Sequence, residues 1–462
     1  MNNIDVFFEP KSIAIIGASD TPKFGYTTTK YLLNSEFKTY PVHIYKTEIM
    51  GHKAYKNIKD IPDDVELAIV LVRNEYVLQS VIDCIEKGVK GIIIESAGFA
   101  ETGKEKYIKL QNKIVEIAKE SKIRIIGPNC IGLTNFNNNF TSTEVNFDNT
   151  LKGNVAIIAQ SGILGNALVD WASDAKVGFS KVITLGNKID VDEVDMLDYL
   201  NNDPDTNVIT LYLEGTKRGK ELKTIFKQMT KPVLIVKNGR SEIGANAVKS
   251  HTSSIAGNDK IYEAIIRQHP GIFRVNDFYE MFNIANVFST QPLPKGRNVA
   301  VITGSGSLGI YACDQIERQG LSLVKLKEET IEKIKSVLPS WVSIKGTIDL
   351  GPSQTTTFET SLKAIMNDEN VHSVIFIFCI PRGPLQAMNL PIYPYFRLMK
   401  KLINKHNKPC VWIVFGSHWV FNYVMEGAKK VKYEIPVMNQ IEHAIKALKL
   451  MYEYGQNLDN KE

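Results

Sequence analysis

The stretch "GNVAIIAQSGILGNALVDWA", residues 153–172, passes from a continuous apolar run through a turn of Ser and Gly into a helical pattern. The stretches "KSIAIIGAS" at residues 11–19 and "RNVAVITGSGSLGIYACDQI" at residues 297–316 repeat this construction. Strands that are apolar along their whole length are typical of parallel sheets covered by helices on both faces. We therefore predict an α/β protein of three doubly wound domains, each built on a parallel sheet of the Rossmann or flavodoxin-like type.

Polar segments between the three repeats mark the predicted domain boundaries. With 462 residues the chain is too long for one compact core. Residues 141–153 are polar without periodicity, and residues 289–298 contain two prolines and a glycine. We predict domains over residues 1–145, 150–290 and 296–455. Further strands are expected at 40–45, 67–72, 90–96 and 123–129, then at 181–186, 208–215 and 231–237, and finally at 372–378 and 408–415.

The composition excludes several classes of protein. A net charge of +5, from 55 basic and 50 acidic residues, is too mild for a dedicated nucleic-acid binder. The five cysteines form no C-x-x-C pair and are expected to be reduced thiols. The first residues, "MNNIDVFFEP", do not have the pattern of a signal or transit peptide, and apolar runs of about eight residues are too short to span a membrane. A cytoplasmic location is expected, without a membrane or nucleic-acid partner.

The three turns predict binding sites for phosphate. A turn of Gly and Ser that opens a helix presents free backbone N–H groups and the positive end of the helix dipole. In any single case a tight strand-to-helix turn is an equally good explanation, but three such turns in one chain favour phosphate-bearing ligands. The second turn offers Ser161, Gly162 and Ile163, and the third offers Ser305, Gly306 and Ser307. Two helix N-termini aimed at one point would hold a phosphate group without a metal ion.

The first turn, Gly17-Ala18-Ser19 followed by Lys23 and Gly25, is the candidate for a dinucleotide-like ligand. It is a weak NAD signal, because the G-x-G-x-x-G pattern is incomplete and the second strand ends in "HIYK" instead of an acidic residue. The cation Lys46 at that place suits a ligand with an additional phosphate group. The chain contains no G-x-x-x-x-G-K-[ST] loop. An activity that uses ATP would therefore need a different nucleotide module, such as one on another chain.

The stretch "AVKSHTSSIAG", residues 247–257, places one imidazole among small and hydroxyl side chains. We expect a flexible loop that ends in glycine. No second His or Cys is close enough in the sequence to share a metal ion with His251. A neutral imidazole attacks phosphorus without prior deprotonation, which suits His251 as a transient carrier of a phosphoryl group.

The chain resembles the NDP-forming acyl-CoA synthetase superfamily, which includes succinyl-CoA synthetase, ATP-citrate lyase and the archaeal ADP-forming acetate–CoA ligases. The likeness extends from about residue 7 to residue 450 and is greatest to the α subunit of the ADP-forming ligases. No single motif is decisive, but their order and spacing are specific. The motifs are "IAIIGAS", "ESAGFAE", "GPNCIG", "AQSGILG", "YLEG", "SHTSSIAG", "TGSGSLG" and "GTIDLG".

This resemblance implies a CoA-binding first domain followed by two domains of the succinyl-CoA synthetase type. It also implies a reversible reaction in which phosphate attacks an acyl-CoA, and the resulting acyl phosphate phosphorylates His251. The loop would then carry the phosphoryl group to ADP, bound with Mg²⁺ on an ATP-grasp module. Because that module is missing from this sequence, a separate β subunit and an α2β2 hetero-oligomer are expected.

The resemblance also implies the roles of individual residues. Glu214 matches the glutamate that hydrogen-bonds the imidazole, and the turns at 161–163 and 305–307 match the two phosphate-binding loops. Asn129 and Cys130 match the segment that lines the thiol end of CoA, although Cys130 has an equally good explanation as a small buried residue. The full set expected to bind CoA is Gly17, Ala18, Ser19, Lys23, Gly25, Val42, Lys46, Ser96, Ala97, Gly98, Asn129 and Cys130.

The sequence departs from the family pattern on the CoA side. Relatives read Tyr-Pro-Val-Asn-Pro-Lys after the second strand, whereas this chain reads "YPVHIYK", and Arg73 stands where a proline is common. A non-catalytic CoA-binding regulatory or scaffold subunit is therefore the alternative hypothesis. A third possibility, an NAD-dependent oxidoreductase, lacks the acidic partner for the ribose. The sequence does not identify the acid, the physiological direction or the choice of ADP over GDP.

Overall fold

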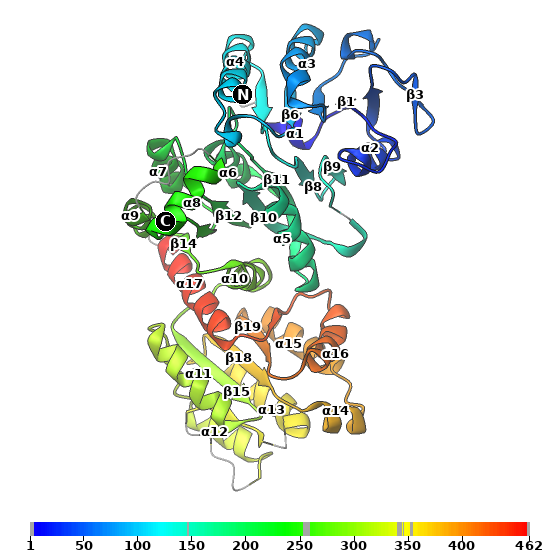
Figure 1. Cartoon of the computed structure of the whole chain (residues 1–462). Helices are drawn as coiled ribbons and strands as arrows, with labels where there is room; N and C mark the ends of the chain where they lie inside the picture. Colours follow the sequence, from blue (N-terminus) through cyan, green and yellow to red (C-terminus); the bar gives the residue numbers. More distant parts are fainter. Residues whose placement is uncertain are drawn as a thin grey trace. The chain divides into compact units, whose positions relative to one another are not determined.

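The computed structural model describes residues 4–145, 147–252, 259–339, 344, 346–351 and 354–459. The chain forms two compact units, Met1–Phe278 and Tyr279–Glu462. Three sheets built mainly from parallel strands confirm the predicted fold class: two lie in the first unit and one in the second (Figure 1). Each sheet contains five parallel strands. If these are numbered along the sequence, their order across the sheet is second, first, third, fourth, fifth, which is a doubly wound arrangement.

The first sheet has the order β2-β1-β5-β6-β7, and all of its strands are parallel. A small antiparallel hairpin, β3-β4, follows β2. The strands are β1 (Ser12–Ile16), β2 (Lys38–Val42), β3 (Glu48–Ile49), β4 (His52–Lys53), β5 (Leu67–Val70), β6 (Gly91–Ile94) and β7 (Arg124–Ile126), and the helices are α1 (Asp5–Phe8), α2 (Tyr26–Leu33), α3 (Asn74–Lys87) and α4 (Glu105–Ser121).

The second sheet has the order β14-β13-β12-β10-β11-β8-β9. Strands β8 and β9, which fall inside the predicted first domain, pair antiparallel at the edge of this second sheet. The strands are β8 (Leu133–Asn135), β9 (Phe140–Thr141), β10 (Leu151–Ala159), β11 (Gly178–Thr184), β12 (Val208–Leu213), β13 (Val233–Lys237) and β14 (Ile272–Arg274), and the helices are α5 (Gly162–Asp174), α6 (Glu193–Asn202), α7 (Gly219–Gln228), α8 (Glu242–Thr252) and α9 (Asp259–Arg267).

The sheet of the second unit has the order β16-β15-β18-β19-β20, and the short strand β17 pairs with the end of β15. The strands are β15 (Asn298–Thr303), β16 (Ser322–Leu323), β17 (Ile348–Asp349), β18 (Ser373–Phe378), β19 (Cys410–Val414) and β20 (Val437–Met438). The helices are α10 (Phe278–Thr290), α11 (Gly306–Arg318), α12 (Glu328–Lys335), α13 (Gln354–Asn367), α14 (Arg382–Met388), α15 (Tyr393–His406), α16 (His418–Lys429) and α17 (Ile441–Asp459).

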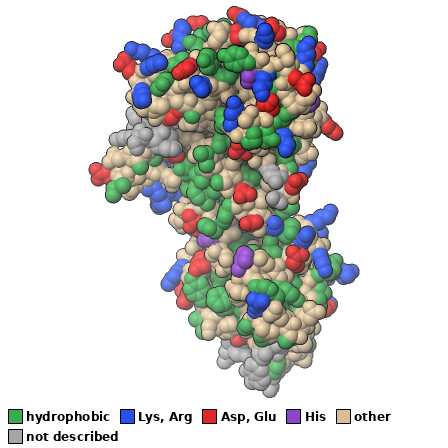
Figure 2. Space-filling model, turned by 45° about the vertical axis from the view of Figure 1, so that its right-hand side comes forward, with side chains coloured by type: hydrophobic (Ala, Val, Ile, Leu, Met, Phe, Trp, Pro, Cys, Tyr) green, Lys and Arg blue, Asp and Glu red, His purple; other side chains and the backbone are tan. Residues whose placement is uncertain are grey.

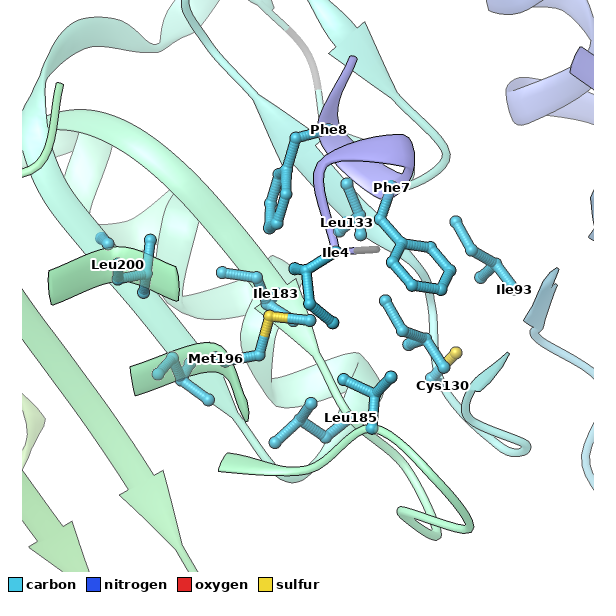
Figure 3. Close-up of a cluster of buried hydrophobic side chains, with 14 of the residues drawn as sticks. Ile4, Phe7, Phe8, Ile93, Cys130, Leu133, Ile183, Leu185, Met196 and Leu200 are labelled. Atoms are coloured by element: carbon cyan, nitrogen blue, oxygen red, sulfur yellow. The ribbon is translucent and has the colours of Figure 1, made fainter. Parts of the chain in front are cut away.

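The two sheets of the first unit share one hydrophobic core. Phe7 and Phe8 of α1 are fully buried and lie in the same cluster as Ile93 of β6 and Ile183 of β11 (Figure 3). Backbone hydrogen bonds reinforce this junction, because the N–H groups of residues 187, 189 and 191 donate to the carbonyls of residues 128, 127 and 125. The carboxyl ends of the two sheets are therefore held together in one unit, while the three-domain division by sequence stays a prediction.

Close packing explains why glycine, and no larger residue, stands at Gly165 and Gly309, at the ends of the second and third repeated turns. A Cβ on Gly165 would lie 2.6 Å from Cγ2 of Thr184, and a Cβ on Gly309 would lie 2.7 Å from Oγ1 of Thr347. Each glycine therefore lets the first turn of its helix, α5 or α11, pack closely against the side chain of a neighbouring threonine. This close approach is the role that a doubly wound fold gives to the last glycine of its turn.

The prediction of a loop at residues 247–257 is wrong for its first half. Residues up to Thr252 belong to α8, which begins at Glu242 with a carboxylate in its first turn, where it favours the helix dipole. The residues "ANAVK" at 245–249 are also compatible with a helix. The backbone of His251 thus lies in the last turn of α8. Its side chain and residues 253–258 lie outside the described structure.

None of the helices in the described ranges is long and apolar enough to cross a membrane. On the face shown in Figure 2, basic and acidic side chains are interspersed, in keeping with the small net charge.

Lys181 and Asp203 form a buried ion pair in the first unit, from which we predict an effect on stability. Nζ of Lys181 lies 2.7 Å from Oδ2 of Asp203, and both side chains are at most 5% exposed. Lys181→Met should lower the free energy of unfolding by about 3–5 kcal/mol, because it leaves a buried carboxylate without its cation. The double variant Lys181→Met/Asp203→Asn should be more stable than the single one. Denaturant unfolding followed by circular dichroism checks this; equal stabilities of the two variants would contradict it.

Candidate functional site

A large pocket, here pocket A, lies at the carboxyl ends of the first sheet. Its volume is ≈ 730 Å³, and its lining includes residues that follow β1, β2, β5 and β6. Strands β1 and β5 are the pair at which the strand order reverses, the usual ligand position in such sheets. A Cβ on Gly17 would come within 2.9 Å of Val72, so glycine keeps this turn open. Six of the predicted CoA residues line the pocket: Gly17, Ala18, Lys23, Val42, Ser96 and Ala97.

Three cationic side chains face pocket A, namely Lys23, Lys56 and Arg73. Sequence reasoning missed Lys56, because it lies in an irregular segment without a motif. Arg73, which departs from the family pattern, lies at the pocket wall between β5 and α3, directly before the first residue of α3. The exposed aromatic rings of Phe24, Tyr45 and Tyr76 also line pocket A. The pocket therefore combines positive charge with apolar surface, which suits a ligand that carries both phosphate groups and a ring.

Lys46 has a different place from the one expected. Its Nζ lies 2.5 and 2.6 Å from the two carboxylate oxygens of Asp20, and Lys46 is not among the residues that line pocket A. The hydrogen bond from Lys46 lowers the pKa of Asp20. The turn that replaces Asn-Pro-Lys is fixed by Nδ1 of His43, which accepts from the backbone N–H groups of Tyr45 and Lys46 at 3.1 and 3.2 Å.

Three further predicted CoA residues have structural contacts and do not line pocket A. Ser19 is buried, and its hydroxyl donates to the carbonyl of Thr21 at 3.1 Å. Gly25 has φ +82° at the start of α2, and Gly98 has φ +97° beside Asn74. Their conformations explain why glycine is found at both positions.

A second pocket, pocket B, adjoins pocket A and has a volume of ≈ 360 Å³. Phe24 and Ala97 line both pockets. Pocket B brings together predicted residues from both sheets of the first unit: Asn129 and Cys130 after β7, and Ser161, Gly162 and Ile163 at the start of α5. Thus the segment expected at the thiol end of CoA and the first expected phosphate turn meet in one pocket.

Gln160 connects the phosphate turn to the end of β12. Its Oε1 accepts hydrogen bonds from the backbone N–H groups of Glu214 and Gly215 at 2.9 and 3.2 Å, and from Nζ of Lys188 at 3.3 Å. Lys188 also forms a buried ion pair with Glu193 at 2.8 Å. Strands β10 and β12 are neighbours at the point where the order of this sheet reverses. Gln160 belongs to the motif "AQSGILG", but sequence reasoning assigned it no role of its own. Lys188 lies outside all of the motifs, and the sequence did not indicate it.

Glu214 is buried at the end of β12, and Oε1 accepts a hydrogen bond from the hydroxyl of Tyr212 at 3.0 Å. Both residues line a third pocket, pocket C, of ≈ 750 Å³. The opposite wall of pocket C is the N-terminal half of α8, with Gly244, Ala247 and Val248. Burial raises the pKa of Tyr212, so its hydroxyl stays protonated as a donor to Glu214. Glu214 and the helix that contains His251 therefore border the same pocket.

A buried lysine lies close to Glu214. Lys237 ends β13, and its Nζ lies 4.7 Å from the ring centre of Tyr262 and donates to the carbonyl of Asn238. Burial lowers the pKa of Lys237 to about 8, although the charges of Asp259 and Glu214 oppose this shift. Lys237 consequently keeps most of its positive charge at neutral pH, beside a site expected to hold phosphate.

Two buried titratable groups lie at the wall of pocket B. Sγ of Cys130 donates to the carbonyl of Ile94 at 3.3 Å, and burial raises the pKa of this thiol. Cys130 is therefore a protonated, packed side chain and not a nucleophile. Burial, together with the charge of Glu144, also raises the pKa of Glu95 well above its usual value.

The third predicted turn lies in the second unit. Ser305 precedes α11, and its backbone N–H donates to Oγ1 of Thr303 at 3.0 Å. Oδ2 of Asp349, at the end of β17, lies 3.0 Å from the position of a Cβ on Gly306. A carboxylate thus already lies at the N-terminus of α11, whereas Ser161 and Gly162 at the start of α5 face pocket B.

Comparison with known proteins places the chain among relatives of known class. Residues 11–135 match the CoA binding domain, and residues 152–288 match the succinyl-CoA ligase like flavodoxin domain. The α subunit of ADP-forming acetate–CoA ligase II from Pyrococcus furiosus is 38% identical in an alignment that covers 98% of this chain and 98% of the relative. The ADP-forming 4-hydroxybutyrate–CoA ligase of Nitrosopumilus maritimus is 36% identical over 81% of this chain and 54% of its own length.

A solved structure of the same class also matches almost the whole chain. It is the dinucleotide forming acetyl-coenzyme A synthetase 1 of Ca. Korarchaeum cryptofilum in complex with phosphate and ADP. Its TM-score is 0.89 at 30% identity, with 99% of this chain and 97% of that chain covered. The chain therefore belongs to the NDP-forming acyl-CoA synthetase superfamily, together with the α subunits of the ADP-forming acetate–CoA ligases.

Proposed function

We propose that this chain is the α subunit of an ADP-forming acid–CoA ligase. It would convert acyl-CoA, ADP and phosphate reversibly to acid, ATP and CoA, through an acyl phosphate and a phosphohistidine at His251. The observation that carries this proposal is the arrangement around Gln160, which ties the phosphate turn of pocket B to Glu214 in pocket C.

In this proposal, pocket A holds the nucleotide and phosphate groups of CoA, and pocket B holds the thioester and the attacking phosphate. The amino end of α5 at Ser161 and Gly162 would stabilise the phosphate charge. Gly306 and its neighbours would have the corresponding role in the second unit. Phosphate would attack the thioester carbonyl, so that the C–S bond breaks, CoA leaves as the thiol and an acyl phosphate forms.

The next step would transfer the phosphoryl group from the acyl phosphate to an imidazole nitrogen of His251 and release the acid. Glu214 would accept a hydrogen bond from the other ring nitrogen, which fixes the tautomer and stabilises the cationic phosphorylated ring. The positive charge of Lys237 is close enough to act on Glu214. Together these groups would support a phosphohistidine long enough for transfer.

The nucleotide step needs a partner that binds ADP with Mg²⁺. We infer an ATP-grasp β subunit and an α2β2 assembly, which would act in the cytoplasm, where CoA and adenine nucleotides are available. The Nitrosopumilus relative supports a second module, since this chain corresponds to only 54% of its length. The relatives are named for acetate and for 4-hydroxybutyrate, so family membership leaves the acid open.

His251 should be the residue that is phosphorylated. When the chain is incubated with acetyl-CoA or another acyl-CoA and ³²P-labelled phosphate, it should acquire an acid-labile, base-stable label. His251→Asn should abolish the label, because amide nitrogen is not a nucleophile, whereas His52→Gln at the exposed hairpin should retain it. Label on His251→Asn would contradict the phosphohistidine, and an unlabelled wild-type chain would favour the non-catalytic CoA-binding subunit.

Glu214 should act through the imidazole. Glu214→Gln should slow the appearance of the label about 100-fold, because the neutral amide no longer stabilises the imidazolium. Tyr212→Phe keeps the carboxylate and removes its 3.0 Å hydrogen bond from the tyrosine hydroxyl, together with the 3.1 Å hydrogen bond that the hydroxyl accepts from Asn238, and should slow labelling less than tenfold. Rapid-quench labelling measures both rates, and CoA affinity should be unchanged in both variants. Equal losses in the two variants would argue against a direct role for the carboxylate.

The cations of pocket A should bind the phosphate groups of CoA. Lys56→Met and Arg73→Met should each weaken CoA binding about five- to tenfold, because each removes one charge-assisted contact. Lys46→Met is the matched control and should change the Kd less than twofold, because Lys46 is paired with Asp20. Isothermal titration calorimetry with free CoA measures these values. A loss in Lys46→Met as large as in the other two would overturn this assignment.

A further inference from the structure

Glu95 is a carboxyl group that neither the proposed reaction nor the fold requires. It directly follows β6 and is 4% exposed, yet its side chain lines pocket B. Within the described part of the chain, Oε1 of Glu95 is buried and has no hydrogen-bond partner. Buried polar atoms in native proteins are almost always paired, so an unpaired one at the wall of a pocket points to a ligand that supplies the partner.

The surroundings of Glu95 keep its carboxyl group in the neutral form. Its neighbours at the pocket wall include Ala97, Cys130 and Ile131, and the charge of Glu144 also opposes ionisation. A neutral carboxyl group has one O–H donor as well as acceptor oxygens. A Cβ on Gly132, whose φ is +75°, would lie 2.0 Å from Oγ of Ser142 and 2.9 Å from Oε1 of Glu95, so only glycine fits where the chain passes this carboxyl group. The carboxyl group of Glu95 can therefore either donate or accept a hydrogen bond at the wall of pocket B, where Ala97, Cys130 and Ile131 also lie.

Pocket B has separate groups for the other parts of the substrate. The amino end of α5 offers backbone N–H groups for phosphate, and pocket A, which shares Phe24 and Ala97 with it, lies on the CoA side. Glu95 is on the side of pocket B formed by the first sheet, next to Asn129 and Cys130. An unsubstituted alkyl chain in this place would bury Glu95 without satisfying it, at the cost of an unpaired polar group.

Taking pocket B as the acyl site, as the proposed function requires, we propose that Glu95 hydrogen-bonds a polar substituent of the acyl chain. The preferred substrates are then short acids that carry a hydroxyl group, and simple alkyl acids are bound less well. The same side chain disfavours a second carboxylate on the acyl chain, because a neutral carboxyl group does not supply a compensating charge. Glu95 is in this sense a specificity-determining residue.

The test compares thioesters that differ by one hydroxyl group. The Kd values of butyryl-CoA and of 2-, 3- and 4-hydroxybutyryl-CoA are measured by calorimetry with the full-length chain. The wild type should bind at least one hydroxy ester about tenfold more tightly than butyryl-CoA, the effect of about one hydrogen bond. Glu95→Leu and Glu95→Val should lose this difference, mainly through tighter binding of butyryl-CoA. Glu95→Gln, which keeps a donor and an acceptor, should retain it.

Free CoA serves as the control, because its affinity should be the same in all four proteins. Equal affinity of the wild type for all four thioesters would overturn the inference, as would a preference that persists in both apolar variants. A wild-type chain that binds neither CoA nor any thioester would instead overturn the proposed function. The two failures are therefore distinguishable in one set of titrations.

Discussion

The side-chain oxygen of Gln160 is the contact on which the geometry of the site depends. Gln160 directly follows β10, and its Oε1 is shared by the backbone N–H groups that follow β12 and by Nζ of Lys188. Because parallel strands end at the same edge of a sheet, a short polar side chain at one strand end reaches the next. The shared acceptor fixes Glu214 relative to the start of α5. Positioning of this kind is what phosphoryl transfer requires from a protein, since the reaction depends on orientation and electrostatics.

The second constraint is the common core of the first unit. Aromatic residues of α1 and aliphatic residues of β6 and β11 are packed in one cluster, and residues 187–191 are hydrogen-bonded to residues 125–128. Two sheets that would otherwise be independent are thereby fixed with their carboxyl ends adjacent. Pocket B exists only because of this packing, as its lining residues come from both sheets. Under the proposed function, this packing would place the thioester and the attacking phosphate side by side.

Three buried titratable groups of the first unit, Lys188, Lys237 and Glu95, differ in how far their charge is compensated. Lys188 is paired with Glu193, and Lys237 keeps a pKa of about 8 despite its burial. Glu95, in contrast, is held neutral, and burial is the main cause. Pairs of titratable groups with opposite environments are a common feature of active sites. Under the proposed function, the positive groups would lie near the path of the phosphate group, and the carboxyl group of Glu95 would lie in the acyl pocket.

The sequence by itself determined the three doubly wound sheets, because continuous apolar strands and Gly-Ser turns are local patterns. Through motifs of fixed spacing it also singled out Glu214, the turns at 161–163 and 305–307, and six of the residues that line pocket A. Only the tertiary structure decided that Lys46 is paired with Asp20, that Lys56 and Arg73 face pocket A, and that β8 and β9 join the second sheet. It alone placed Gln160 and Glu95. These outcomes depend on contacts between residues far apart in the chain, such as the 54 positions between Gln160 and Glu214, and local patterns carry no information about such contacts.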